Sequence, residues 1–161
     1  MARSVHGAIL DQIQKDLRGV ELPGIPADNI IKFMAPSDLK ERWKGYPGVM
    51  LAPVGSESID PGAGTAAKDD IGYPVLVAIL DRAKVESAQG KDAKMDTWLY
   101  WRQLVIDTFI HKRLAITITG LDFFDTTIEP ADIVDLGAWQ DPGIMASLLV
   151  LRVWARKQRR L

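Results

Sequence analysis

The clearest guide to the fold is the stretch Tyr73-Pro-Val-Leu-Val-Ala-Ile-Leu80, which is uncharged, apolar and partly β-branched. A run of this length and composition indicates a central strand that is covered on both faces. Polar stretches bound it on either side, from Gly55 to Asp70 and from Asp81 to Lys94. Both stretches are rich in small, polar or charged residues, so we predict a long loop on each side of the strand.

Two helices are predicted, one before that strand and one after it. Between Val5 and Arg18 apolar residues recur at helical spacing, with Ser4 placed as an N-cap and Gly19 placed to end the helix. A longer helix is predicted from Met95 to Lys112, with Asp96 as its N-cap. Its apolar stripe consists of Trp98, Leu99, Trp101, Val105, Ile106, Phe109 and Ile110. Helical spacing favours core packing of this stripe over a stacking platform for nucleic-acid bases.

Further strands are predicted from short segments in which apolar residues run together or alternate. They cover Asn29–Ala35, Gly48–Val54, Leu114–Thr119, Thr126–Val134 and Ser147–Arg156, with a helical turn at Asp38–Trp43. Pro53 suits an edge position or the end of a strand. The order of elements predicts an α+β fold, with a mixed, mainly antiparallel sheet and two α-helices packed on one face. The length of 161 residues predicts a single domain over residues 1–161.

Composition excludes several classes of function. The chain has no cysteine, which excludes a disulfide framework, thiol catalysis and thiolate metal sites. Its two histidines are too few to favour a zinc enzyme. Twenty basic and 21 acidic residues give a net charge of −1, so no global field marks a nucleic-acid or membrane protein. With no signal-peptide core and no apolar run near the ~20 residues that span a bilayer, we expect a soluble protein without membrane contact.

The motifs that carry chemistry are weak. Gly62-Ala-Gly64-Thr-Ala-Ala67 matches a dinucleotide fingerprint by spacing alone, because no strand comes directly before it and no helix follows. Asp69 and Asp70 are adjacent carboxylates in a predicted loop, where solvated side chains are far commoner than catalytic ones. Neither His6 nor His111 has a nucleophile or a metal-ligand partner beside it in sequence. We therefore expect no cofactor, no bound metal and no enzymatic activity.

The layout of charge is more informative than any motif. From Asp122 to Asp141 there are six acidic residues and no Lys or Arg, and from Arg152 to Leu161 there are five basic residues and no acid. The acidic segment includes Asp122, Asp125, Glu129, Asp132 and Asp135, and the basic end consists of Arg152, Arg156, Lys157, Arg159 and Arg160. The acidic residues lack the fixed spacing and central glycine of a calcium loop.

Three interpretations of these charges stay open. The first is a solvated strand followed by a frayed tail. In the second, the acidic segment of one copy contacts the basic end of the next, a head-to-tail contact that closes a ring. In the third, the basic end contacts nucleic-acid phosphates without reading sequence.

Several segments follow one another along nearly the whole chain. An amphipathic helix that ends near Leu17 is followed by Tyr46-Pro-Gly-Val-Met-Leu51 and, after a variable loop, by Asp69-Asp-Ile-Gly-Tyr-Pro-Val-Leu-Val77. After another loop comes the helix that bears Leu99-Tyr-Trp-Arg102, and the terminal strand Leu148–Arg156 ends in basic residues. In this order and length of elements, the chain resembles the tail terminator proteins of long-tailed bacteriophages, a family of minor tail or head-tail joining proteins.

The resemblance implies a structural protein without catalysis. Such proteins have a small fold of one sheet with two helices, and they form hexameric rings that cap the tail tube at its full length. The ring stops the addition of tube subunits and offers a surface to the connector of the head. The implied partners are other copies of the chain, the tail tube protein, the connector or stopper protein, and DNA that passes through the lumen without sequence specificity. The implied location is the neck of the virion, assembled in the cytoplasm of the bacterial host.

Candidate site residues follow from this resemblance and from the charges. The five basic residues are candidates for a subunit interface or for the DNA lumen, and the five acidic residues for the opposing interface. Asp69 and Asp70 form a candidate assembly loop that orders against a neighbouring ring. The nearest alternative is a head-completion, stopper or other neck adaptor protein. In other classes, the rivals are a small nucleic-acid-binding module that uses the basic C-terminus, and an enzyme whose site would need Asp69, Asp70 or His111.

Overall fold

The computed structural model describes residues 3–34, 45–61, 68–82, 88–129, 131–134 and 143–158, without the side chains of residues 61, 88 and 91. The elements follow in the order α1 (Val5–Val20), a 3-10 turn (Ala27–Asn29), β1 (Ile30–Lys32), β2 (Gly48–Pro53), β3 (Ser58–Pro61), β4 (Lys68–Arg82), α3 (Ala88–Phe109), β5 (Leu121–Glu129) and β6 (Ile144–Gln158). The predicted helical turn at Asp38–Trp43 lies outside the described residues.

The strands form one mixed sheet in the order β1-β2-β4-β6-β5, and β3 pairs with the first part of β4. β1 and β2 are parallel, and every other described pair is antiparallel. β4 and β6 pair along their whole length, from Lys68 opposite Gln158 to Arg82 opposite Ile144. At 3.4 Å per residue this ladder is about 50 Å long. The predicted strand Tyr73–Leu80 is therefore central, and it is longer at both ends than its apolar run indicated.

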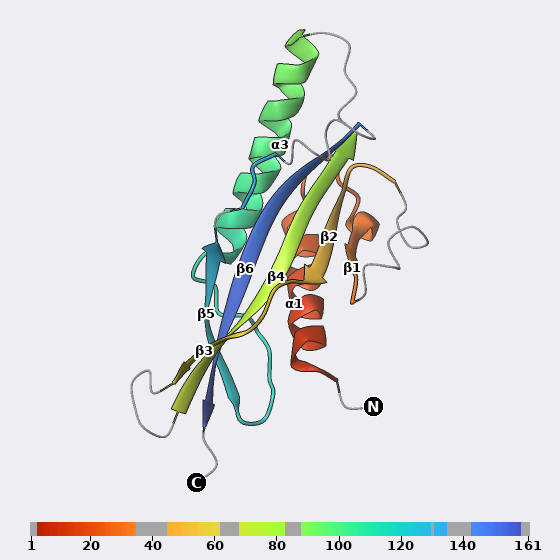
Figure 1. Ribbon diagram of the computed structural model, residues 1–161. Coiled ribbons are helices and arrows are strands. Elements are labelled where there is room, and N and C mark those ends of the chain that lie inside the picture. The colour runs from red at the N-terminus through yellow and green to blue at the C-terminus, as the bar shows by residue number, and fades with distance from the viewer. Residues whose placement is uncertain are drawn as a thin grey trace.

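Both helices lie on the same face of the sheet (Figure 1). The apolar sides of α1 and α3 meet alternate residues of the strands in one core, which confirms the predicted α+β arrangement. Fully or nearly fully buried members of this core include Ile9, Ile13, Leu17, Val75, Val77, Ile79, Trp98, Trp101, Val105, Phe109, Leu149, Leu151 and Val153. Ser4 caps α1 as predicted, because its hydroxyl accepts a hydrogen bond from the Gly7 N–H at 3.0 Å.

The aromatic stripe of α3 is core, as its spacing predicted, and both indoles are anchored. Trp98 Nε1 donates to Asp81 Oδ2 at 2.8 Å and Trp101 Nε1 donates to the Pro23 carbonyl at 2.7 Å. A buried indole needs such a partner for its N–H. The two bonds tie α3 to the end of β4 and to the turn that follows α1.

The predicted helix ends are wrong in three places. α3 begins at Ala88, not Met95, so Asp96 lies inside the helix and is not its N-cap. The segment before Met95 contains alanine and lysine, and these helix formers outweigh Gly90. α3 also ends at Phe109, before Lys112. α1 continues past Gly19 to Val20, and its C-cap Glu21 takes the left-handed conformation at φ 56°.

The predicted loops and edge strands also need correction. Strand β3 lies inside the predicted loop from Gly55 to Asp70, and β4 already begins at Lys68 and continues to Arg82. Polar residues form strands here because a neighbouring strand supplies backbone partners, β4 for β3 and β6 for β4, and pairing overrides propensity. The segment 114–119 is not a strand and makes one isolated bridge, from Ile118 to Leu121. The strand is Leu121–Glu129, not Thr126–Val134. Gly120, at φ 84°, turns the chain into it.

The remaining strand predictions hold with shifted ends. β2 spans Gly48–Pro53, so Pro53 stands at a strand end, and β6 contains the whole of the predicted Ser147–Arg156. The predicted Asn29–Ala35 shortens to Ile30–Lys32. Asn29 is buried and its side-chain amide donates to the carbonyls of Gly45 and Pro47, so it joins the chain just before β1 to the chain just before β2.

Candidate functional site

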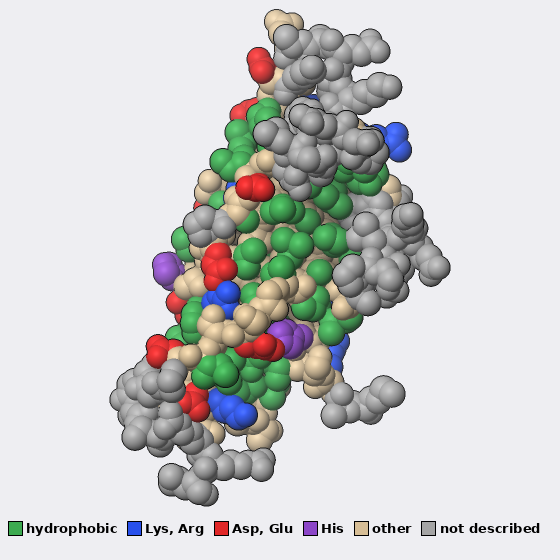
Figure 2. Space-filling model, viewed as in Figure 1, with side chains coloured by type: hydrophobic (Ala, Val, Ile, Leu, Met, Phe, Trp, Pro, Cys, Tyr) green, Lys and Arg blue, Asp and Glu red, His purple; other side chains and the backbone are tan. Residues whose placement is uncertain are grey.

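The face of the sheet that carries no helix is apolar along its middle. Alternate residues of β2, β4 and β6 lie on this open face, and Met50, Leu76, Leu80, Leu148 and Val150 are half-buried there. Figure 2 looks onto this face and shows hydrophobic side chains gathered over the middle of the sheet, with charged groups toward its lower end. The expectation that the central strand is fully covered on both faces is therefore wrong for this face. A sheet with helices on one side leaves such apolar surface available to a partner.

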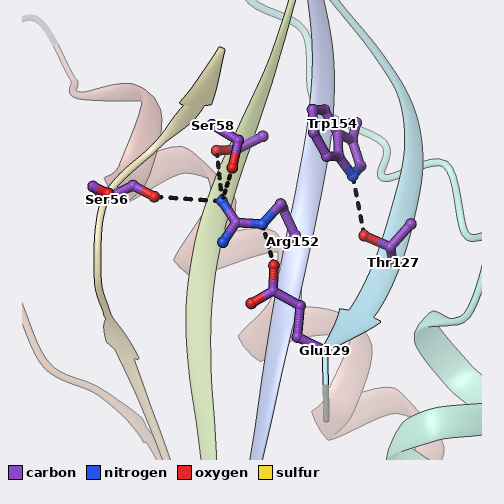
Figure 3. Close-up of polar contacts among 7 residues, drawn as sticks. Ser56, Ser58, Thr127, Glu129, Arg152 and Trp154 are labelled. Carbon is purple, nitrogen blue, oxygen red and sulfur yellow. Dashed lines mark hydrogen bonds and ion pairs between the residues drawn. The ribbon is translucent and has the colours of Figure 1, made fainter. Parts of the chain in front are cut away.

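Below the apolar band, Arg152 of β6 crosses the open face and joins neighbouring strands (Figure 3). Its Nη1 donates to Ser58 Oγ at 2.6 Å and to the Ser56 carbonyl at 3.3 Å, and its Nε donates to the Glu129 carboxylate. Beside it, Trp154 Nε1 donates to Thr127 Oγ1 at 3.0 Å. The Arg152 side chain is 14% exposed. One guanidinium therefore holds β3, β6 and β5 in a fixed relation.

Arg152 can lie flat on the sheet because the residue beneath it is Gly72 of β4. A Cβ at Gly72 would stand 2.7 Å from Arg152 Cδ and 3.1 Å from the Trp154 ring. Real Cβ contacts are not this short, so a side chain at this position displaces the arginine. The conformation of Arg152 thus depends on a glycine that lies 80 residues away in sequence.

Replacing Gly72 by alanine is expected to lower the free energy of unfolding by about 1–3 kcal/mol, because the methyl group forces Arg152 off its partners. Urea unfolding measures the change. The matched control is Gly19→Ala in α1, where no heavy atom lies within 4 Å of the new Cβ. That substitution should leave stability unchanged or raise it by up to about 1 kcal/mol. Equal effects of the two substitutions would show that the packing of Arg152 on Gly72 contributes nothing.

Arg156 and Asp70 form a second cross-strand pair on the open face. Arg156 Nε donates to Asp70 Oδ1 at 2.7 Å and Nη2 donates to Oδ2 at 2.9 Å, a two-pronged contact between residues directly opposite in the β4–β6 ladder. The hydrogen bonds from Arg156 hold the pKa of Asp70 below its usual range. A β-bulge at Phe124 places that ring 5.0 Å from the guanidinium carbon of Arg156.

This pair predicts a specific response to acid. The folded-state pKa of Asp70 is lowered, so its stabilisation is present above the unfolded pKa of about 3.9 and is lost as pH falls through the folded value. Asp70→Asn should therefore be less stable than the wild type near neutral pH, and its stability should fall less steeply in acid. Urea unfolding over a pH series checks this, with Asp96→Asn, at an exposed acid of α3, as the control. Parallel curves for the wild type and Asp70→Asn would contradict it.

The other predicted charged residues are dispersed, with Asp132 beside Leu148 of β6 and the rest of those described nearer the C-terminal end of β6. Asp122 accepts from Arg113 at 2.8 Å, and His111 Nδ1 lies 3.4 Å from Asp125 Oδ1. Lys157 is exposed and lies opposite Asp69 in the ladder. Asp135, Arg159 and Arg160 lie outside the described residues. Within one copy, acidic partners thus already engage Arg152 and Arg156, while Lys157 points to solvent.

Sequence reasoning missed Arg102, which reaches from α3 to the edge of the sheet. Its Nη1 donates to the Leu148 carbonyl at 2.6 Å and to Ser147 Oγ at 3.0 Å. The same guanidinium donates to the carbonyls of Asp132 and Ala131 at 3.2 and 3.1 Å. Burial lowers the pKa of Arg102. These hydrogen bonds satisfy backbone and hydroxyl acceptors at the edge of β6, beyond the residues that pair with β5. In the sequence, Arg102 was recognisable only as a charged residue at a helix position between core residues.

A second missed cluster joins His6 to Glu57 and Tyr73. His6 Nε2 lies 2.7 Å from Glu57 Oε1, and its ring stands edge-on to the Tyr73 ring with centroids 5.3 Å apart. The hydrogen bond to His6 lowers the pKa of Glu57, whereas burial and the nearby Glu57 raise the pKa of Tyr73. The cluster fixes the start of α1 against the chain that enters β3. No local sequence motif could have predicted this cluster, because His6 and Glu57 are 51 residues apart.

The residues that an enzyme would need are not brought together. Asp70 is bound to Arg156, and Asp69 lies on the opposite face of β4 because neighbouring strand residues alternate. The His111 side chain is 75% exposed at the end of α3, beside β5. Within the described residues no group of three or more His, Cys, Asp or Glu side chains could hold a metal ion. In those same parts of the chain, no helix has the length and apolar character needed to cross a membrane.

No protein-family model matches the chain, and no curated protein matches it. Function is therefore inferred from the surfaces of the molecule together with the resemblance in its sequence.

Proposed function

We propose that this chain is a structural protein that assembles with copies of itself into a ring, caps a phage tail tube and joins the tail to the head connector. The observation that carries the proposal is the open face of the sheet, which is apolar along its middle and half-exposed. Exposed apolar bands of this kind are typical of protein interfaces. The resemblance to tail terminators supplies the ring and the place in the virion.

The lower part of the sheet, where arginine side chains join neighbouring strands by hydrogen bonds, supports an assembly role. Arg152 and Arg156 fix strands β3 to β6 through side-chain bonds on the open face. A surface that is already rigid loses little conformational freedom when a partner binds, so less of the contact energy is spent on ordering. The geometry thus suits repeated, shape-specific contacts between subunits.

The same contacts weigh against the nucleic-acid-binding alternative. Binding to phosphates requires cations that are free to replace the counterions of the nucleic acid. Of the five basic residues at the C-terminal end, Arg152 and Arg156 are bound to carboxylates of their own chain. Binding of DNA by the free monomer, with strong salt dependence, would favour this alternative over ours.

Electron microscopy of the purified chain in negative stain tests the proposal. We expect closed rings of uniform size with a central opening that could pass a DNA duplex. Particles of single-copy size at every concentration would contradict self-assembly and would favour a stopper or other adaptor of the neck. Open fibres would contradict the cap, because a terminator must close.

A further inference from the structure

Strand β3 borders the lower part of the sheet (Figure 1) and pairs on one side only, with β4. Pro61 lies opposite Asp69 and has no N–H, so this pair exchanges no backbone hydrogen bonds. By alternation Ser58 and Asp60 bond to β4, and Ile59 points its N–H and C=O away from β4. Among the described residues, no hydrogen bond reaches these two groups of Ile59. Ile59 is also 66% exposed, so its backbone and its side chain are both available to a partner.

The other edges of the sheet are each engaged by their own chain. At β1 the outward carbonyl of Ile30 accepts a hydrogen bond from Gln14 Nε2 at 2.8 Å. At β5 the carbonyl of Thr126 accepts from the His111 N–H at 2.8 Å, and the edge of β6 beyond β5 is held by Arg102. Proteins cover edges in this way because an unpaired strand edge recruits another strand. The edge of β3 differs from the others, since its outward groups have no such partner in the described chain.

The segment 115–119 has the pattern of a strand but belongs to no strand of the sheet. Isoleucine and threonine alternate in it, and both residue types favour strands. Ala115, Thr117 and Thr119 are exposed. No hydrogen bond within the described part of the chain reaches the backbone of Ala115 or Thr117. Local pattern and fold normally agree, so a strand pattern without a paired strand indicates that its partner lies on another chain.

Open space lies beside this segment. A hollow of about 360 Å³ is lined by residues 115–118 and, from α1 and the residues before it, by Arg3, Asp11 and Lys15. Two cations and one acid give these charged side chains a net positive charge. The strand β3 carries an exposed acid, Asp60, next to its open position. The hollow therefore offers both room and opposite charge to the edge of β3.

The two segments are too far apart to pair within one copy. Pro61 of β3 lies opposite Asp69 of β4, which lies opposite Lys157 of β6. Lys157 lies opposite Leu121, and Leu121 bridges to Ile118 in the segment. Two strands thus lie between β3 and Leu121, and three steps of about 4.8 Å separate them by about 14 Å. Backbone hydrogen bonds need about 3 Å between donor and acceptor, so the pairing requires a second copy.

We propose that the outer edge of β3 in one copy pairs with the segment 115–119 of the next copy, as an added strand. This rests on the proposed function, because it names a contact between copies in the ring. Strand addition takes its affinity from main-chain hydrogen bonds and its specificity from alternate side chains. Each copy offers one surface of each kind, so the contact is head to tail and repeats until the ring closes.

Two proline substitutions break the two halves of this contact separately. Ile59→Pro removes the outward N–H of β3, and Thr117→Pro removes an N–H of the segment 115–119. Proline is tolerated where the N–H of an edge strand faces solvent, and both side chains are exposed, so folding should be retained, which circular dichroism checks. Each variant alone should associate at least about tenfold more weakly than the wild type. The matched controls, Ile59→Val and Thr117→Val, keep the N–H and a β-branched side chain and should associate like the wild type.

Mixing the two proline variants gives the decisive result. The Ile59→Pro chain keeps an intact segment 115–119 and the Thr117→Pro chain keeps an intact β3 edge. An equal mixture should therefore form pairs of two copies and stop there, which light scattering measures.

Hydrogen exchange of the wild type provides a test that needs no variant. The amides of Ile59 and Thr117 should be protected in the assembled protein and unprotected in the dilute single copy. Wild-type strength of association in Ile59→Pro, a mixture without pairs, or unprotected amides in the assembly overturns this contact and leaves the proposed function standing. A wild-type chain that never assembles overturns both.

Discussion

Replacing Arg102 by alanine is expected to lower the free energy of unfolding by about 3 kcal/mol. The guanidinium donates to the carbonyls of Leu148, Asp132 and Ala131 and to the Ser147 hydroxyl. Alanine removes the donor from the Leu148 and Ala131 carbonyls and from the Ser147 hydroxyl, whereas the Asp132 carbonyl keeps its bond from the Leu148 N–H. Removing only the donor of a hydrogen bond costs more free energy than the bond itself contributes to stability. The loss of stability should therefore far exceed that of an ordinary surface substitution.

Urea unfolding of the Arg102→Ala variant, compared with that of the Gln103→Ala variant, measures this effect. Gln103 is the next residue of α3, is exposed, and donates within the helix to Asp107 at 2.7 Å. Its loss should cost no more than about 0.5 kcal/mol. The stability of Arg102→Lys should lie between those of the two alanine variants. Lysine keeps the charge but lacks the planar guanidinium group that reaches several carbonyls. Similar stabilities of the alanine variants would show that Arg102 does not hold the edge of the sheet.

Replacing Trp98 by alanine is expected to cost about 3–5 kcal/mol of unfolding free energy. The indole is 2% exposed, packs in the core between α3 and the sheet, and donates to Asp81 at 2.8 Å. Alanine removes the hydrogen bond and leaves a cavity that rigid strands on one side cannot fill. Tm should fall together with the midpoint of urea unfolding.

The conservative variant Trp98→Phe separates packing from hydrogen bonding. Phenylalanine keeps much of the buried area and loses the bond to Asp81, so it should be clearly less damaging than alanine. A loss below about 1 kcal/mol for Trp98→Ala would mean that the stripe faces solvent, as a base-stacking platform would require. That outcome would return weight to the nucleic-acid alternative.

The sequence predicts the parts of this fold in which burial follows a regular period. The alternation of Leu149, Leu151 and Val153, and the helical recurrence of Trp98, Val105 and Phe109, directly record which side of each element meets the core. The architecture of one mixed sheet under two helices follows from the order of such segments. Element ends were less predictable, because Lys68 and Asp69 join a strand through pairing with β6 and not through their own propensity.

The polar contacts could not be predicted, since they join residues that are remote in sequence. Asp70 and Arg156 are 86 residues apart, and Arg152 reaches Ser58 over 94 residues. The charge layout singled out Arg152, Arg156 and Glu129 as candidates for an interface between copies or, for the arginines, for the DNA lumen. The structure gives each of the three an oppositely charged partner within one chain.

The most direct test of the central claim is the mass of the wild-type chain in solution, measured by light scattering over a wide range of concentration. The account predicts a shift from the 17.8 kDa single copy to one defined multiple, with no further growth once the ring has closed. A mass that stays at a single copy throughout the range would contradict it.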